Sequence, residues 1–192
     1  MHKVIATLAA GATVVGLVAT ATTATAAPPE RTTIVDTVIA VSGPSGFDTT
    51  DDFDILREAV VATGSFDLLD GRRQLTVFAP TDSAFIALAD ALDDEVVTTE
   101  EAAFNKLATT LGVDAIGEVL KYHIAPGERF SGDVVPAERI RTLSGGFLTK
   151  DAGSTTFDQG VPAPASILVD AGLFDIDVDN GVIHAIDNVL VP

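Results

Sequence analysis

The first part of the chain places apolar side chains at the spacing of helix turns. Two segments carry them at positions i, i+3 or i+4, and i+7, which is typical of a helix with one buried face. These apolar residues are Ile34, Val38 and Val41 in the first segment and Phe53, Leu56 and Val60 in the second. Each pattern stops near a glycine, Gly43 or Gly64, and glycine commonly ends helices. The sequence therefore predicts two amphipathic helices before residue 65.

A short apolar run then predicts one strand followed by a third helix. Residues 75–79 are apolar apart from Thr76, and Pro80 stops the run. Thr81 is placed to cap the helix that follows. The predicted buried stripe of that helix is Phe85, Leu88, Ala89 and Leu92.

Two further helices are predicted before residue 127. Thr98 and Glu101 have the spacing of a capping box at a helix start. The apolar positions that follow, before Gly112, are Phe104, Leu107, Ala108 and Leu111. The last helix begins near Asp114 and ends at Pro126-Gly127. Its inward face is predicted to hold Ile116, Val119, Leu120 and His123.

Beyond Gly132 the apolar pattern changes towards a period of two, which predicts strands. The candidate strands are 139–143, 147–151, 166–170, 173–179 and 182–191. Apolar residues alternate with aspartates in the segment 173–179, which indicates a strand with one solvent-facing side. The segment 182–191 is apolar on both faces apart from three polar residues, so we expect a central strand. Helices mainly first and strands mainly later predict an α+β domain.

Residues 1–26 have the composition of a secretory signal peptide. Lys3 supplies a positive charge, an uncharged run extends from Val4 to about Ala21, and Ala24-Thr25-Ala26 matches a cleavage site. We expect cleavage after Ala26, a short flexible segment over 27–31 and one domain over 32–192. If cleavage fails, the run approaches the roughly 20 apolar residues that span a bilayer and would anchor the chain. The protein is thus predicted to be secreted or held at the cell surface.

The negative charge of the chain limits the classes of molecule that it is expected to bind. Aspartate and glutamate number 28 against 11 lysines and arginines, which gives a formal net charge of -17. Such a chain repels nucleic acid and anionic membrane surfaces, so we expect neither as a partner. The absence of cysteine excludes disulfides and zinc-thiolate sites. Stability must therefore come from packing.

Three segments together resemble the fasciclin domain family. Thr76–Phe85 resembles the first conserved block of that family, Tyr122–Gly127 its Tyr-His motif, and Asn180–Pro192 its second conserved block. The three occur in the order of the family and at plausible spacing. The residues that carry the resemblance are Thr76, Phe78, Pro80, Thr81, Asp82, Phe85, Tyr122, His123, Pro126, Gly127, Asn180, Gly181 and His184.

The resemblance implies a fold, a function and a binding site. The fold is a fasciclin-like α+β domain, in which a helical layer packs on a wedge-shaped β-sandwich. The function is adhesion or extracellular-matrix association without catalysis, with an extracellular protein or polysaccharide as partner. Animal members bind integrins through an Asp-Ile pair and the Tyr-His motif, which correspond here to Asp175, Ile176, Tyr122 and His123. Asp177 replaces the hydrophobic residue that usually follows the Asp-Ile pair, so integrin recognition is not expected.

The sequence gives weaker support to catalysis and to metal binding. Asp82, His123 and His184 are the residue types of a hydrolase, but their positions favour structural roles. Asp82 lies at the start of a predicted helix, where a carboxylate can accept backbone N–H bonds. The two histidines lie among apolar residues, where buried polar groups must find hydrogen-bond partners. The spacing Asp175-x-Asp177-x-Asp179 begins like an EF-hand loop, but Asn180 replaces the glycine and Ile186 the glutamate that calcium requires. We therefore expect no metal, no cofactor and no enzyme activity.

Two alternatives to adhesion remain open at this stage. The first is an extracellular carrier of a small apolar ligand, which needs an apolar pocket of roughly 300 Å³ or more. The second is a hydrolase that uses His123 or His184 with Asp82.

Overall fold

The helices of the computed structural model follow the apolar pattern of the first half of the chain closely. The structure describes residues 32–42, 47, 52–93 and 96–192. The predicted signal peptide over 1–26, the segment 27–31 and the helix end at Gly43 lie outside these residues, so those predictions stay predictions. The helices are α1 (Ile34–Val41), α2 (Asp54–Thr63), α3 (Phe66–Leu69), α4 (Asp82–Leu92), α5 (Glu100–Leu111), α6 (Val113–Tyr122) and α7 (Ser131–Val134).

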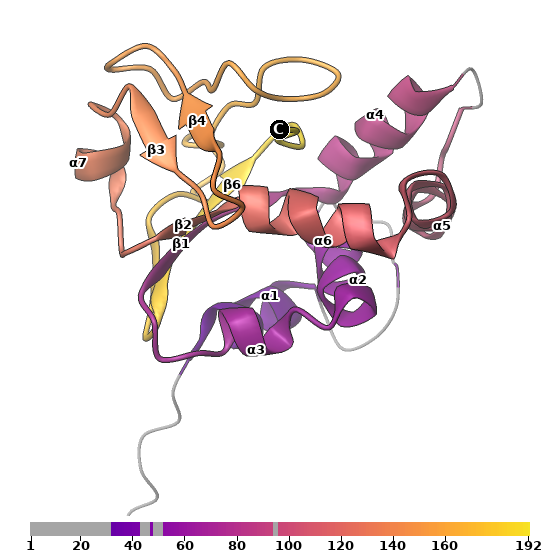
Figure 1. The fold of residues 1–192 in the computed structure, drawn as a ribbon, viewed down its shortest axis with the longest axis horizontal. Helices are drawn as coiled ribbons and strands as arrows, with labels where there is room; N and C mark the ends of the chain where they lie inside the picture. The colour runs from indigo at the N-terminus through magenta and orange to yellow at the C-terminus, as the bar shows by residue number, and fades with distance from the viewer. Residues whose placement is uncertain (1–31, 43–46, 48–51, 94–95) are drawn as a thin grey trace, which may run out of the picture. The chain divides into compact units, whose positions relative to one another are not determined.

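Four strands form one mixed sheet in the order β2-β1-β6-β5, and two form a separate hairpin, β3-β4 (Figure 1). The strands are β1 (Leu75–Pro80), β2 (Ile124–Pro126), β3 (Arg139–Arg141), β4 (Phe147–Thr149), β5 (Ile176–Val178) and β6 (Gly181–Ile186). β1 and β6 run parallel, whereas β2 and β5 pair antiparallel at the two edges. Every residue of β1 and β6 is buried. The prediction of a central strand after residue 181 is therefore confirmed.

The two faces of the β1–β6 pair lie in different cores because side chains alternate along a strand. Val77 and Ile183 face the helices and belong to the larger core. Phe78 and Ile186 face the other way, into a second core that includes Ile140 of β3. The β3–β4 hairpin thus covers one face of the sheet while helices cover the other. This arrangement confirms the α+β prediction of a helical layer on a β-sandwich.

The helical layer is built on α2, which packs against α4, α5 and α6. Gly64 ends α2 in the left-handed conformation, with φ of 65°, as its glycine predicted. Two residues of the predicted stripes remain exposed: Val41 by 42% and Leu111 by 37%. Both are the final residue of their helix, beyond the reach of the core.

Three predicted helix ends differ from the structure. The side chain that caps α5 is that of Thr99, whose Oγ1 accepts the N–H of Ala102, so no capping box joins Thr98 to Glu101. Thr81 occupies the cap position of α4, but its hydroxyl pairs with that of Ser83 instead of the helix backbone. α6 ends at Tyr122 and not at Pro126, because the backbone from Ile124 pairs with β1 as β2.

All five strands predicted beyond Gly132 also differ in extent. The predicted strands 139–143, 147–151 and 173–179 are shortened to the three-residue strands β3, β4 and β5, and two predictions differ more. Residues 166–170 form only isolated bridges, from Ser166 to Thr156 and from Ile167 to Ile186. β6 stops at Ile186 and does not continue to Val191, because its parallel partner β1 ends at Pro80, which pairs with Ile186. In the described part of the chain, no helix is long and apolar enough to cross a membrane.

Candidate functional site

Asp82 is the first residue of α4, but its carboxylate caps a different helix. Oδ1 accepts the N–H of Ile55 at 2.8 Å, and Oδ2 accepts those of Asp54 and Asp52 at 3.1 and 3.2 Å. These donors belong to the first turn of α2 and the residues before it, where the N-cap residue Phe53 makes no side-chain bond and Asp52 Oδ1 also accepts the N–H of Asp54, at 3.0 Å. The sequence predicted that Asp82 would accept bonds at the start of its own helix, and this was wrong. Asp82 instead ties α2 to the end of β1.

The surroundings of Asp82 favour its protonated form. Burial raises the pKa of Asp82 to about 7, against the lowering effect of the Ile55 and Asp54 N–H groups. The Asp52 side chain and the charge of Glu100 raise the pKa further. Near neutral pH this carboxyl group is therefore much more protonated than an ordinary aspartate.

We expect Asp82→Asn to remove a pH dependence of stability. The folded-state pKa near 7 lies above the ordinary value of 3.8, so the group stabilises the fold at low pH and loses this contribution as pH rises through 7. An amide cannot ionise, so the variant should gain stability relative to the wild type between pH 5 and pH 8. Urea unfolding at several pH values measures the difference. Asp177→Asn, on the exposed side of β5, is the matched control, and parallel curves for wild type and Asp82→Asn would contradict the expectation.

His123 is buried and both nitrogens of its ring are used within the fold. Its side chain is 2% exposed at the C-terminal end of α6. Nδ1 donates to the carbonyl of Val119 at 2.7 Å, and Nε2 accepts the N–H of Leu190 at 2.9 Å. Burial lowers the pKa of His123 to about 4, against the raising effect of the Val119 carbonyl. The ring is therefore neutral at pH 7 and joins α6 to the C-terminal segment.

His184 plays an equivalent part on the other face of the sheet. Its fully buried ring stacks on Phe78, with ring centres 5.6 Å apart. Nε2 donates to the carbonyl of Arg129 at 2.9 Å, and Nδ1 accepts the N–H of Asp175 at 3.2 Å. Burial lowers the pKa of His184, while the Arg129 carbonyl and the Asp175 charge oppose the shift.

Both buried histidines make the stability of the fold depend on pH. Protonating either one costs folding free energy, so the stability that each neutral ring contributes is lost as pH falls below about 6.5.

Tyr122 supports the β3–β4 hairpin from beneath. The side chain is 4% exposed, and its hydroxyl donates to the carbonyl of Phe147 at 2.9 Å. The ring lies against Gly146, where an added Cβ would come within 2.7 Å of Cε2. Burial raises the pKa of Tyr122, which keeps the hydroxyl a donor. Tyr122 is therefore behind the molecular surface.

Asn180 connects three elements through one buried amide. Its Oδ1 accepts the N–H of Ile34, the first residue of α1, at 2.8 Å. Its Nδ2 donates to the carbonyls of Leu69 and Gly71, at 2.6 and 3.2 Å. The next residue, Gly181, has φ of 155° and lies against the carbonyl of Leu75. These two residues fix the start of β6 against α1, α3 and β1.

The remaining motif residues also lie within the fold. The hydroxyl of Thr76 donates to the carbonyl of Gly127 and accepts the N–H of Arg129. Phe78 and Phe85 are core residues. Pro80 ends β1, and Pro126 ends β2.

The candidate partner-binding residues do not form one exposed surface. Tyr122 and His123 are buried, whereas Asp175 and Ile176 are partly exposed. Asp175 has φ of 54°, and its Oδ1 accepts the N–H of Ser131 at 2.6 Å. No hydrogen bond among the described residues joins one pair to the other. A partner could therefore reach Asp175 and Ile176 directly, but Tyr122 and His123 only through what they support.

The geometry gives little basis for a catalytic centre. Within the described residues, no hydrogen bond or ion pair links Asp82 to His123 or His184, as a nucleophile-activating pair would require. Both imidazoles have used their donor and acceptor atoms. In the same part of the chain, no group of three or more His, Cys, Asp or Glu side chains is placed to hold a metal ion.

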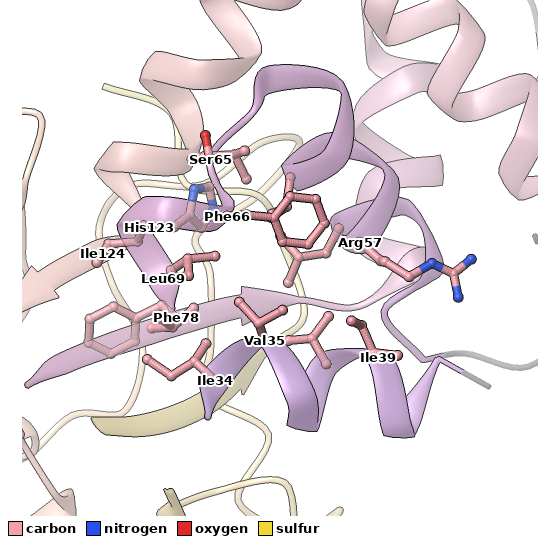
Figure 2. A pocket seen from close by; sticks show the side chains of 15 residues that line it. Ile34, Val35, Ile39, Arg57, Ser65, Phe66, Leu69, Phe78, His123 and Ile124 are labelled. Carbon is pink, nitrogen blue, oxygen red and sulfur yellow. The ribbon is translucent and has the colours of Figure 1, made fainter. Parts of the chain in front are cut away.

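An apolar cavity lies between α1, α2, α3 and β1. Ile34, Val35 and Ile39 line it from α1, and Phe66 and Leu69 from α3 (Figure 2). Its free volume is about 30 Å³, about a tenth of the roughly 300 Å³ that a small-ligand pocket needs. A second apolar cavity, between α2, α5 and α6, holds about 20 Å³. Neither has the volume that the carrier alternative needs.

Two features of the structure escaped the sequence analysis. The Lys150 side chain is buried and its Nζ donates to the carbonyls of Val135 and Ser154, at 2.6 and 2.8 Å. A lysine before an aspartate gives no local signal of burial. The second feature is a pair of arginines beside an exposed aromatic residue on β3 and β4. The alternation Arg139-Ile140-Arg141 was the available signal, since it places both arginines on one face of a strand.

Comparison with known proteins gives consistent matches. The family model described as the Fasciclin domain matches residues 51–192. Protein sll1483 of Synechocystis sp. is 32% identical over 140 residues, which cover 73% of this chain and 67% of that protein. The transforming growth factor-beta-induced protein ig-h3 of Sus scrofa is 30% identical over 144 residues, which cover 74% of this chain and 18% of that protein.

A solved structure has a similar fold. The FAS1 domain pair from the insect cell adhesion molecule fasciclin I matches with a TM-score of 0.56 at 16% identity. The match covers 83% of this chain and 51% of the domain pair. The chain thus spans about half the length of that pair and less than a fifth of ig-h3.

Proposed function

Because the chain belongs to the fasciclin domain family, we propose that it is a secreted or cell-surface adhesion module that binds an extracellular partner without catalysing a reaction. Family membership associates the domain with adhesion proteins, since one structural relative is an insect cell adhesion molecule. For the present chain, the proposal that it binds without catalysis rests on how its buried polar residues are hydrogen-bonded.

One observation carries the non-catalytic part of the proposal. The residues whose side chains could act as a general acid or base are Asp82, His123 and His184. The polar atoms of each side chain are hydrogen-bonded to backbone groups and join two elements of the fold. A general base needs a free acceptor within reach of a substrate proton. These residues hold the surface in place, and binding is left to exposed side chains.

Recovery of partners from native material tests the proposal. The purified protein, immobilised and exposed to the surface extract and medium of the cells that produce it, should retain a protein or polysaccharide after washing. Mass spectrometry and sugar analysis identify the retained material. Asn105→Ala, an exposed change on α5, should retain the same material. Retention of nothing above the level of a bare support would count against adhesion.

The location of the protein has a separate test. Proteins exported through a cleaved signal peptide lose it, so the form recovered from the medium should begin at Ala27. Intact-mass measurement of the secreted and envelope-bound fractions shows where the chain begins. A chain found only in the membrane fraction with Met1 retained would support the anchored alternative.

A further inference from the structure

The outer face of the β3–β4 hairpin has a composition unlike the rest of this acidic chain. Ile140 and Leu148 point inward and are buried. The alternate residues therefore face solvent, and the register places Arg141 opposite Phe147 and Arg139 opposite Thr149. Both arginines are exposed, and the Phe147 side chain is 41% exposed. In Figure 1, β3 and β4 (orange) lie far from α4 and α5.

The arginine and the aromatic ring are ordered against each other. The guanidinium carbon of Arg139 lies 4.1 Å from the centre of the Phe147 ring, along the diagonal of the hairpin. A cation over an aromatic ring is attracted by the electrons of its face. This contact limits the rotamers of both side chains before any ligand arrives, which reduces the entropy lost on binding.

The two guanidinium groups have no carboxylate partner in the part of the chain that the structure describes. Other basic residues there do form ion pairs: Arg57 with Asp54, Lys106 with Asp93, and Lys121 with Glu118. The nearby acid Asp158 accepts a hydrogen bond from the hydroxyl of Thr149 at 2.7 Å. On a chain of net charge -17, Arg139 and Arg141 are therefore a local pair of positive charges that no carboxylate of the described residues neutralises.

The hairpin is held rigidly against the Tyr-His motif. The hydroxyl of Tyr122 bonds the carbonyl of Phe147, and the N–H of Leu143 bonds the carbonyl of Ile124 at 2.8 Å. Gly145, with φ of 92°, permits the tight turn between the strands. The buried tyrosine thus sets the position of the residues that lie on the surface.

We propose that the outer face of the β3–β4 hairpin binds an anionic polysaccharide, with sugar carboxylates paired to Arg139 and Arg141 and a sugar ring against Phe147. This inference rests on the proposed adhesion function and names its site and partner class. Guanidinium groups bind carboxylates through two parallel hydrogen bonds. Consecutive outward-facing residues of a strand are about 7 Å apart, so the two arginines can pair with separate carboxylates along one polymer.

The exposed ring favours a polysaccharide over an acidic peptide. An acidic sugar carries a carboxylate beside the apolar C–H face of its ring, which matches an arginine beside an aromatic ring. Aspartate and glutamate side chains have no such face. A peptide could also add to a strand edge, but β3 has three residues and offers only a short edge.

Binding to immobilised polygalacturonate tests the site. The purified protein should bind this polymer and not neutral dextran, with affinity that falls as salt is added. We expect the double variant Arg139→Gln/Arg141→Gln to bind at least tenfold more weakly. Arg72→Gln/Arg73→Gln makes the same charge change at two exposed arginines elsewhere, and should bind within twofold of the wild type. Tyr122→Phe keeps both arginines but loses the bond to the hairpin, and should weaken binding severalfold.

The outcomes separate this inference from the proposed function. Equal weakening by the two double variants would mean unspecific charge attraction and overturn the site. Binding to polyglutamate as tight as to polygalacturonate would overturn the partner class. If the wild type binds cells of its source but not polygalacturonate, the inference fails and adhesion stands. If it binds neither, both fail. Circular dichroism of each variant confirms that the fold is retained.

Discussion

Replacing Gly181 by alanine is expected to cause the largest loss of stability of any single change considered in this fold. A Cβ at this position would lie 2.0 Å from the carbonyl oxygen of Leu75, and its backbone φ of 155° is one that other residues rarely adopt. The neighbouring atoms are backbone atoms of β1, the parallel partner of β6, so they cannot move aside without breaking the central strand pair. We expect a loss of about 4 kcal/mol or more, a large part of the roughly 5–15 kcal/mol that stabilises a typical domain.

Thermal unfolding followed by circular dichroism measures this effect. A loss of that size lowers the midpoint of unfolding by roughly 10 °C or more in a domain of this length. Gly132→Ala is the matched control, because its new Cβ would meet no atom within 4 Å. A Gly181→Ala protein that melts within 3 °C of the wild type would show that the start of β6 lies differently against β1.

Replacing Asn180 by alanine should cause the second largest loss. The change removes the acceptor of the Ile34 N–H and the donor to the carbonyls of Leu69 and Gly71. Each buried group left without a partner costs about 1–3 kcal/mol. We therefore expect a total loss of about 3–5 kcal/mol.

The loss should be visible first in α1, whose first N–H depends on Asn180. Hydrogen exchange of residues 34–41 should accelerate more than that of β1, because α1 loses the hydrogen bond from the Ile34 N–H to the Asn180 side chain and β1 loses no side-chain bond to Asn180. Asn105→Ala deletes the same side chain on the exposed face of α5 and should change stability by less than about 0.5 kcal/mol. Uniform acceleration of exchange in α1 and β1 would contradict a local role for Asn180.

The accuracy of the sequence predictions depended on whether the signal was local. α1, α2 and α4 were predicted because their buried residues recur within one or two turns, and Gly64 marked a helix end. The burial of His123 and His184 followed from the apolar residues around them, and the structure confirms it. These inferences need only neighbours along the chain.

Long-range pairings gave no comparable signal. Asp82 caps α2, about 28 residues earlier in the chain, and no spacing within its own helix indicates this. The end of α6 was placed four residues late because β2 forms only by pairing with β1. Residues 166–170 have the composition of a strand, but the structure gives them isolated bridges instead of a continuous partner.

The candidate partner-binding residues also show what the sequence could not predict. The family resemblance indicated Tyr122 and His123, but it could not show that both side chains are buried. Their hydrogen bonds explain why such residues could matter for binding without touching a partner, since Tyr122 bonds the exposed hairpin from beneath.

The most direct test of the account is a binding isotherm of the labelled, purified protein on intact cells of its source. A non-catalytic adhesion module should bind reversibly and to saturation, be displaced by unlabelled protein, and leave its retained partner chemically unchanged. The Gly181→Ala variant should not compete at a temperature at which it is unfolded and the wild type is folded. Absence of saturable binding, or release of a cleaved partner at a rate proportional to the amount of protein, would contradict the proposed function.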